Sequence, residues 1–211
     1  MSMRDWTIAT TFALLISVFS GAAYAGGDPA AGKAQAMVCA ACHGADGATG
    51  IDPSYPSLAG QNEKYLNRQL TMFQSGARNI PVMTAQLIGK SEKDLADLAA
   101  FYASLPAKGK EAGGSDVEIA TATRIYKGGI AAKGVAACAA CHGVSGEGNM
   151  LAGFPRIGGQ VANYTIAQLT AYREGQRDSD EEYGAMMRNV AQGLTDGEIR
   201  LLADYLQGLG R

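Results

Sequence analysis

The sequence contains little histidine and cysteine, and it has almost no net charge. Its 211 residues include only two histidines and four cysteines, and acidic and basic residues nearly balance, for a net charge of −2. That balance excludes a basic nucleic-acid-binding protein and a polybasic membrane-binding protein. No hydrophobic alternation persists long enough to predict a β-sheet. Apart from the N-terminus, no segment is apolar enough to predict a membrane span.

All of the scarce cysteines and histidines lie in two copies of one short motif. The segment Cys-Ala-Ala-Cys-His-Gly occurs at 39–44 and again at 138–143. In C-x-x-C-H, two thiols spaced three residues apart can each add to one vinyl group of a porphyrin, and the next histidine is held under the iron. The motifs therefore predict two covalently bound haem c groups, attached and ligated by Cys39, Cys42 and His43 and by Cys138, Cys141 and His142.

Two other uses of the motif must be weighed. A thioredoxin-like redox pair would need a βαβ context, and no strand–helix–strand pattern surrounds either copy. Thiolates and imidazoles could also bind zinc, and paired cysteines could form disulfides. The long repeat of the flanking sequence favours haem over both.

The N-terminus has the pattern of a secretory signal. Arg4 gives a basic start, residues 7–22 are apolar, and Ala23-Tyr24-Ala25 is a small-x-small cleavage site. We expect residues 1–25 to be a signal peptide and the mature protein to lie in the periplasm, because bacteria attach haem covalently outside the cytoplasm. An uncleaved membrane anchor is the alternative, but the apolar run is short for a span.

The second half of the chain repeats the first. A shift of 99 residues aligns Cys39 with Cys138 and continues through both middle segments, until an acidic insertion of five residues raises the shift to 104. A repeat of this length indicates duplication of a whole domain. We expect domain 1 at 26–107, a surface linker at 108–115 and domain 2 at 116–211. The acidic run, which we expect to be a solvated loop, contains Asp178, Asp180, Glu181 and Glu182.

Each half is predicted to be all-α. Asp28-Pro29 is an N-cap followed by proline in the first turn, and it should open a helix that runs into the first motif. The corresponding helix of the second half is expected at 117–126. Segments 61–74 and 160–174 are apolar at helical spacing and predict a middle helix in each half. Capping boxes at Ser91-x-x-Asp94 and Thr195-x-x-Glu198 should begin the last helix of each half.

With both histidines used under the irons, the opposite face of each iron needs lysine, water or methionine. Methionine is the usual ligand in electron-carrying c haems. Met83 and Met187 lie in equivalent loops, each eight residues before the cap of a final helix. Met186 is the alternative for the second haem, because adjacent residues cannot both bind one iron. Together with the four porphyrin nitrogens, a His–Met pair fills all six positions of the iron, which favours electron transfer over catalysis.

These motifs resemble those of class I cytochrome c, and the chain from about residue 28 to 209 is similar to the cytochrome c4 family. The similarity extends to Tyr-Pro-Ser-Leu-Ala-Gly-Gln at 55–61 and Phe-Pro-Arg-Ile-Gly-Gly-Gln at 154–160. In class I cytochromes a proline carbonyl accepts a hydrogen bond from the proximal imidazole and orients it. The resemblance gives that role to Pro56 for His43 and to Pro155 for His142.

The resemblance also implies how the domains pack and what the protein does. It implies two domains related by pseudo-twofold symmetry, with the haem propionates facing the interface. It implies a periplasmic electron shuttle, loosely associated with the membrane, with a quinol-oxidising complex as donor and a haem–copper terminal oxidase as acceptor. Two other functions stay open: the dihaem subunit of a sulfide-oxidising flavocytochrome, and a dihaem peroxidase, which needs an iron with a vacant face.

Overall fold

The computed structural model describes residues 26–210, so the expected signal peptide lies outside the described residues. Within this range the chain is helical and has no strand beyond two isolated β-bridges, Ile130 with Val135 and Asn149 with Phe154. The all-α prediction is confirmed. None of the helices between residues 26 and 210 has the length and apolar character needed to cross a membrane.

Side-chain caps begin several helices of the first half. The Asp28 carboxylate accepts a hydrogen bond from the Ala30 backbone at 2.8 Å, and Ser91 and Asp94 form the predicted capping box. The predicted continuous helix into the first motif is wrong, because a turn at Ala36 divides it into two helices. The first half contains α1 (Pro29–Gln35), α2 (Met37–His43), α3 (Glu63–Ser75), α4 (Pro81–Gln86) and α5 (Glu92–Ser104).

The second half repeats this arrangement with local differences. Thr195 and Glu198 form the predicted capping box, and Ser115 with Glu118 forms a further one that begins the helix before the second motif. That helix ends where Gly129 adopts a positive φ of 69°. The second half contains α6 (Asp116–Gly128), η1 (Ala131–Lys133), α7 (Ala139–His142), α8 (Ala162–Arg173), η2 (Glu181–Tyr183), α9 (Met186–Ala191) and α10 (Asp196–Gly208).

The acidic insertion is exposed at three of its four acidic residues, but Asp180 departs from the predicted solvated loop. The Asp180 side chain is buried and accepts hydrogen bonds from the backbone nitrogen and Nε of Arg188, at 2.9 and 2.8 Å. Only Asp178, Glu181 and Glu182 are exposed. The prediction is therefore wrong for Asp180, because a buried carboxylate is tolerable when a cation and backbone donors satisfy it. Asp180 closes the loop that leads into α9.

Helices α1 and α5 approach each other closely because the contact is made by glycine. A Cβ atom built on Gly32 would lie 2.0 Å from the Asp97 carbonyl oxygen and 2.8 Å from the Cβ atom of Phe101. The Asp97 carboxylate also accepts a hydrogen bond from the Asp28 backbone at 2.8 Å. A side chain at position 32 would therefore push α1 away from α5 and break this contact.

We expect Gly32→Ala to lower the free energy of unfolding by about 1–3 kcal/mol, the usual range for overpacking. The matched control is Gly128→Ala at the end of α6, where an added Cβ meets no atom within 4 Å. There the better helix propensity of alanine should leave stability unchanged or raise it by up to about 1 kcal/mol. Thermal unfolding of the haem-loaded proteins by circular dichroism compares them. Equal stabilities of the two variants would contradict the close approach.

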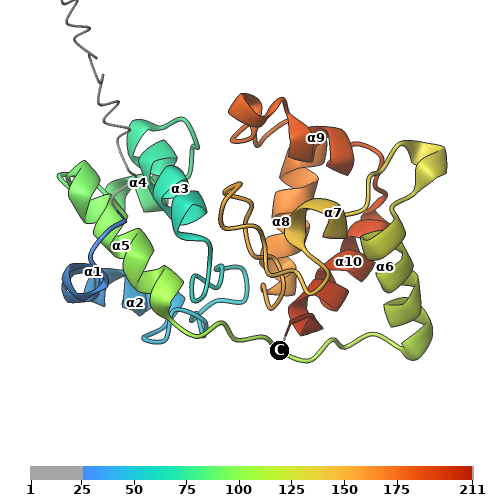
Figure 1. Ribbon diagram of the computed structural model, residues 1–211, viewed down its shortest axis with the longest axis horizontal. Helices are drawn as coiled ribbons and strands as arrows, with labels where there is room; N and C mark the ends of the chain where they lie inside the picture. Colours follow the sequence, from blue (N-terminus) through green and yellow to red (C-terminus); the bar gives the residue numbers. More distant parts are fainter. Residues whose placement is uncertain (1–25, 211) are drawn as a thin grey trace, which may run out of the picture.

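The two halves lie side by side, with α3 and α8 facing each other across the centre and the connecting segment running along one edge (Figure 1). The connecting segment is held at its far end, because the backbone nitrogens of Gly113 and Gly114 donate to the Asp204 carboxylate at 2.8 and 2.9 Å. Each half has an apolar core between its last helix and the helices around its motif.

Candidate functional site

Each motif ends in a buried histidine whose ring is fixed by a proline. Nδ1 of His43 lies 3.0 Å from the Pro56 carbonyl oxygen, and Nδ1 of His142 lies 2.9 Å from that of Pro155. A carbonyl oxygen can only accept, so Nδ1 carries the proton and Nε2 keeps its lone pair. Burial lowers the pKa of both imidazoles, against the opposing effect of the proline contact, so they stay neutral near pH 7. A neutral imidazole with a free Nε2 is the form that binds a metal.

The four cysteines are free, half-buried thiols. Burial raises the pKa of Cys39, and it raises that of Cys138 to about 11. A redox-active C-x-x-C pair needs a lowered thiol pKa, so the structure argues against thioredoxin-like chemistry. Both thiols instead pack against the apolar core of their own half. That is the surrounding an apolar porphyrin edge needs.

The two predicted ligand methionines lie in short helices and not in the predicted loops, Met83 in α4 and Met187 in α9. Met83 is half-buried and packs against the apolar cluster of Phe73, Leu87 and Leu95. Met187 is also half-buried, whereas the neighbouring Met186 is 37% exposed. Met37 and Met150 are more exposed still, and the Met72 sulfur accepts a hydrogen bond from Gln69 at 3.8 Å. Met83 and Met187 thus remain the predicted distal ligands.

Two glutamines, both buried, cross between the halves in equivalent positions. Gln61 donates to the Arg156 carbonyl at 2.8 Å and accepts from the Arg156 nitrogen at 2.7 Å. Gln160 does the same with Ser57, donating at 3.0 Å and accepting at 2.8 Å. The same surface is used by both halves, as in a symmetric dimer. This reciprocity is the predicted pseudo-twofold arrangement.

A pair of arginines is buried at the centre of the same interface. Arg78 and Arg177 are each 7% exposed. Their guanidinium groups share the side-chain oxygens of Gln69 and Gln168 at distances of 2.6 to 3.0 Å. Within residues 26–210 neither arginine has a carboxylate partner. Buried like charges without a counter-charge are costly, so the pair indicates that an anionic group belongs at this place.

Two tyrosines complete the cluster. Arg177 donates to the Tyr65 hydroxyl at 3.0 Å, and Arg78 donates to the Tyr164 hydroxyl at 3.1 Å. Burial raises the pKa of Tyr65, but the nearby Arg177 and Arg78 outweigh burial and hold it below its ordinary value. The shift reports an excess of positive charge in this space. The sequence carried a signal for the cluster, because its arginines, glutamines and tyrosines are identical in both halves outside the motifs.

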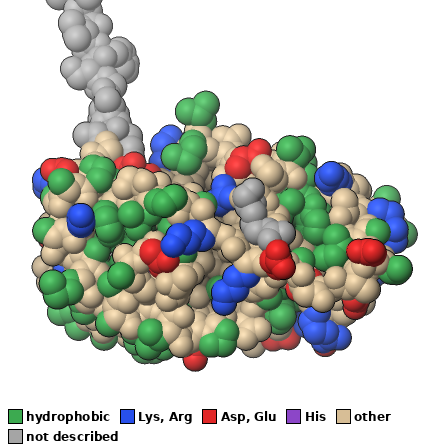
Figure 2. Space-filling model, turned by 90° about the horizontal axis from the view of Figure 1, so that it is seen from below, with side chains coloured by type: hydrophobic (Ala, Val, Ile, Leu, Met, Phe, Trp, Pro, Cys, Tyr) green, Lys and Arg blue, Asp and Glu red, His purple; other side chains and the backbone are tan. Residues whose placement is uncertain are grey.

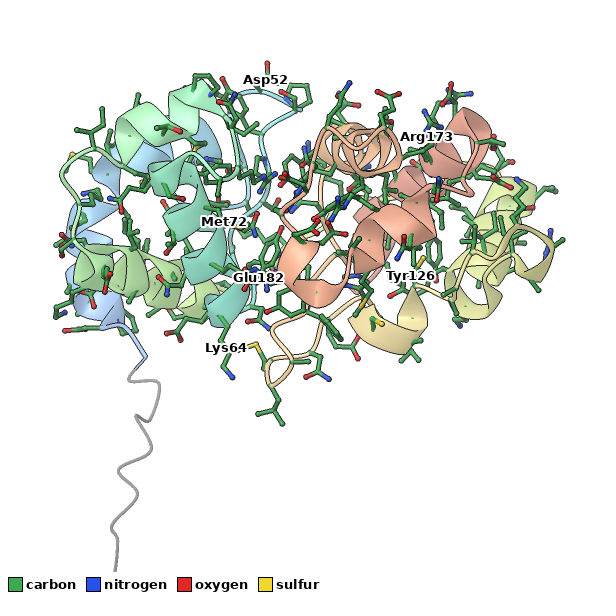
Figure 3. The ribbon with its side chains drawn as sticks, turned by 90° about the horizontal axis from the view of Figure 1, so that it is seen from above. Asp52, Lys64, Met72, Tyr126, Arg173 and Glu182 are labelled. Atoms are coloured by element: carbon green, nitrogen blue, oxygen red, sulfur yellow. The ribbon has the colours of Figure 1, made fainter. Side chains whose placement is uncertain are left out.

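Some contacts between the halves have no symmetric counterpart. The Arg68 guanidinium lies over the Tyr183 ring at 4.3 Å, and Tyr183 belongs to the insertion that only the second half carries. Nearby, Lys64 reaches the Leu151 carbonyl at 3.3 Å, and Figure 3 shows Lys64 and Glu182 on either side of this boundary. Nε of Arg68 is buried and has no hydrogen-bond partner in the described part of the chain. The insertion therefore adds to the interface on one side only.

These residues fit two haem c groups. Each half offers a thiol pair beside an apolar core and a neutral, oriented imidazole. The unpaired arginines of the interface fit the haem carboxylates. No group of three or more His, Cys, Asp or Glu side chains among the described residues could hold a metal ion by itself. The zinc alternative therefore finds no support in the arrangement of these residues.

Comparisons with known proteins agree with the geometry. The family model for cytochrome c matches residues 29–106 and 129–210. Cytochrome c4 of Pseudomonas aeruginosa is 43% identical over 197 residues, which cover 93% of this chain and 96% of that protein. The thiosulfate dehydrogenase electron acceptor of Stutzerimonas stutzeri is 34% identical over 219 residues, covering 100% of this chain and 98% of that protein.

A solved structure extends the comparison to three dimensions. The crystal structure of reduced recombinant cytochrome c4 from Pseudomonas stutzeri matches with a TM-score of 0.81 and 39% identity. The match covers 87% of this chain and 99% of that one, so it includes both halves and their packing. The chain belongs to the cytochrome c family and, within it, to the cytochrome c4 proteins, so it is an electron carrier that holds two covalently bound haem c groups.

Proposed function

We propose that the protein is a periplasmic shuttle that carries electrons along a respiratory chain to a haem–copper terminal oxidase. The observation that carries this proposal is that both halves have the same arrangement of the predicted iron ligands. Each half has a buried imidazole next to a proline carbonyl and a half-buried methionine in an equivalent short helix, Met83 in α4 and Met187 in α9. Such a site has no open position for a substrate, which suits transfer of electrons between proteins.

The proposed iron ligands are His43 with Met83 and His142 with Met187. Met186 is the alternative to Met187. Each haem, when bound, takes up or releases one electron at its iron. Pro56 and Pro155 hold the imidazole planes, and the apolar packing around Met83 keeps water from the distal side. The chain therefore presents a rigid, dry surrounding that changes little when the charge of the iron changes.

Arg78 and Arg177 are the proposed partners of the haem propionates. Their burial and lack of any carboxylate partner in residues 26–210 support this role. Charge-assisted contacts between guanidinium and carboxylate groups are strong and fix orientation. The same two arginines would then offset part of the propionate charge and hold the two halves together.

The surface supports transient docking to redox partners. On the face seen in Figure 2, hydrophobic, basic and acidic side chains are interspersed, and no patch of one charge covers it. The proposed donor is a quinol-oxidising complex, and the proposed association with the membrane is loose. A second donor is favoured by one relative: the protein named a thiosulfate dehydrogenase electron acceptor matches the whole of this chain. A thiosulfate-oxidising dehydrogenase is therefore the alternative donor.

We expect the reduced protein to be oxidised rapidly by membranes that contain a haem–copper oxidase, with the rate rising with oxidase concentration. Stopped-flow absorbance of the haems measures this rate, and cyanide, which blocks the oxidase, is the control. The oxidised protein is then mixed with a quinol-oxidising complex and its quinol, or with a thiosulfate dehydrogenase and thiosulfate. The faster reduction identifies the donor class. Oxidation no faster than in air would contradict the proposed acceptor.

A further inference from the structure

One peptide unit joins the first histidine to the opposite half of the molecule. The carbonyl of the Pro56–Ser57 peptide accepts the hydrogen bond of His43 Nδ1 at 3.0 Å. The N–H of that same peptide donates to Oε1 of Gln160 at 2.8 Å. His43 is thereby connected through a single planar peptide to a side chain of the second half.

The second histidine has the equivalent connection to the first half. The carbonyl of the Pro155–Arg156 peptide lies 2.9 Å from His142 Nδ1, and its N–H donates to Oε1 of Gln61 at 2.7 Å. Each half therefore supplies the glutamine that holds the proline peptide of the other half. The connection is crosswise and occurs twice.

The orientation of both glutamine amides is fixed by their partners. Oε1 of Gln160 accepts from Ser57 and from its own neighbour Val161 at 2.9 Å, while Nε2 donates to the Ser57 carbonyl at 3.0 Å. Oε1 of Gln61 likewise accepts from Arg156 and from Asn62, the latter at 2.8 Å. A flipped amide would face donor with donor and acceptor with acceptor, so only one orientation satisfies all contacts.

Hydrogen bonds in such a chain polarise one another. An acceptor on the peptide N–H makes the carbonyl of the same peptide a stronger acceptor. A stronger acceptor on Nδ1–H increases the basicity of the imidazole at Nε2, and a more basic ligand favours the ferric state of the iron. The peptide units thus offer a path by which a glutamine in one half affects the iron of the other.

We propose that Gln61 and Gln160 are positioning residues that tune the iron of the opposite half, through the proline peptide that orients its histidine. Gln160 acts on the haem of the first motif, and Gln61 acts on the haem of the second. This proposal rests on the proposed histidine ligands. It adds that contact between the halves is part of each iron's surroundings.

The test compares Gln160→Met and Gln61→Met in the full-length, haem-loaded protein. Methionine matches glutamine in length but offers no amide oxygen or nitrogen. In Gln160→Met we expect the midpoint potential of haem 1 to rise and that of haem 2 to stay unchanged. In the reduced state the NMR signal of the His43 Nδ1 proton should move upfield, and that of His142 should not. Gln61→Met should give the reverse pattern.

Two further variants separate this role from a structural one. Gln160→Glu keeps an acceptor oxygen for the Ser57 N–H, so the His43 proton signal should stay closer to wild type than in Gln160→Met. Tyr183→Leu removes the stack on Arg68 across the interface but touches neither proline peptide, so both potentials should be unchanged. The Gln160→Glu variant therefore tests the effect on the His43 signal even if Gln160→Met weakens the contact between the halves.

The outcomes divide cleanly. A shift confined to haem 2 in Gln160→Met, or an equal shift of both haems, would overturn the crosswise path. Equal effects of Gln160→Met and Gln160→Glu on the His43 signal would do the same. Failure of the underlying ligand proposal is recognised separately, because wild-type protein would then lack the spectrum of two histidine-ligated haems.

Discussion

Replacing Met83 by alanine is expected to remove the sulfur-to-ferric-iron absorption band of one haem and to lower the midpoint potential of that haem alone. Thioether sulfur stabilises ferrous iron, so its loss favours the ferric state. Each tenfold change in that preference is about 59 mV for a one-electron couple. A redox titration followed at the haem bands resolves a shift of this size. The opened iron should also bind cyanide.

The second half provides the matched comparison. Met187→Ala should affect the other haem in the same way. Met186 is 37% exposed, so Met186→Ala should leave both spectra intact. Loss of the band in Met186→Ala instead would show that the repeat alignment misassigned the ligand by one position. If neither variant changes the band, the second iron has a different distal ligand and its site is not the closed one proposed.

Replacing Cys39 and Cys42 together by alanine is expected to leave the chain with one covalent haem and to unfold most of the first half. The Cys39 thiol packs against the apolar core formed by residues of α3 and α5, and we expect the haem to complete that core. A domain of this size has a small apolar core, so loss of the haem should lower its free energy of unfolding much more than loss of a single buried side chain. Mass spectrometry counts the haems, and circular dichroism measures the lost helix.

Replacing Cys138 and Cys141 by alanine is the reciprocal experiment. The second half should lose its haem while the first keeps its own, because each motif packs against the core of its own half. Retention of haem after acid–acetone extraction confirms a covalent link in the half that remains. Loss of both haems from either double variant would contradict independent sites and make the interface part of each core.

Local chemistry explains why so much of the fold could be predicted. The capping boxes at Ser91 and Thr195 involve residues three positions apart, and both begin helices as predicted. The proline contacts of His43 and His142 followed from a family resemblance, and each joins residues only 13 positions apart. The distal methionines stay predictions, since burial favours Met83 and Met187 without showing a bond to iron.

The pseudo-twofold packing followed from the resemblance, but the individual contacts of the interface could not be predicted, because their partners are far apart in the chain. Arg78 meets a tyrosine 86 positions away, and Arg177 meets one 112 positions away. No local pattern encodes such pairs, although their identity in both halves was visible. The prediction for Asp180 was wrong for a related reason. Its charge suggested that the side chain is exposed to solvent, but it is buried against Arg188, and the sequence alone does not show that contact.

The reciprocal glutamine contacts show that the two halves pack like the subunits of a symmetric dimer, although they belong to one chain. In a dimer of identical subunits every substitution appears on both sides of the symmetry axis at once. Here Ser57 occupies one side and Arg156 the other, and Tyr183 stacks on Arg68 in a single copy. Because the two halves are joined in one chain, each side of a symmetric contact can change without the other. The two haem sites can therefore come to differ in redox potential, so that an electron occupies one haem before the other.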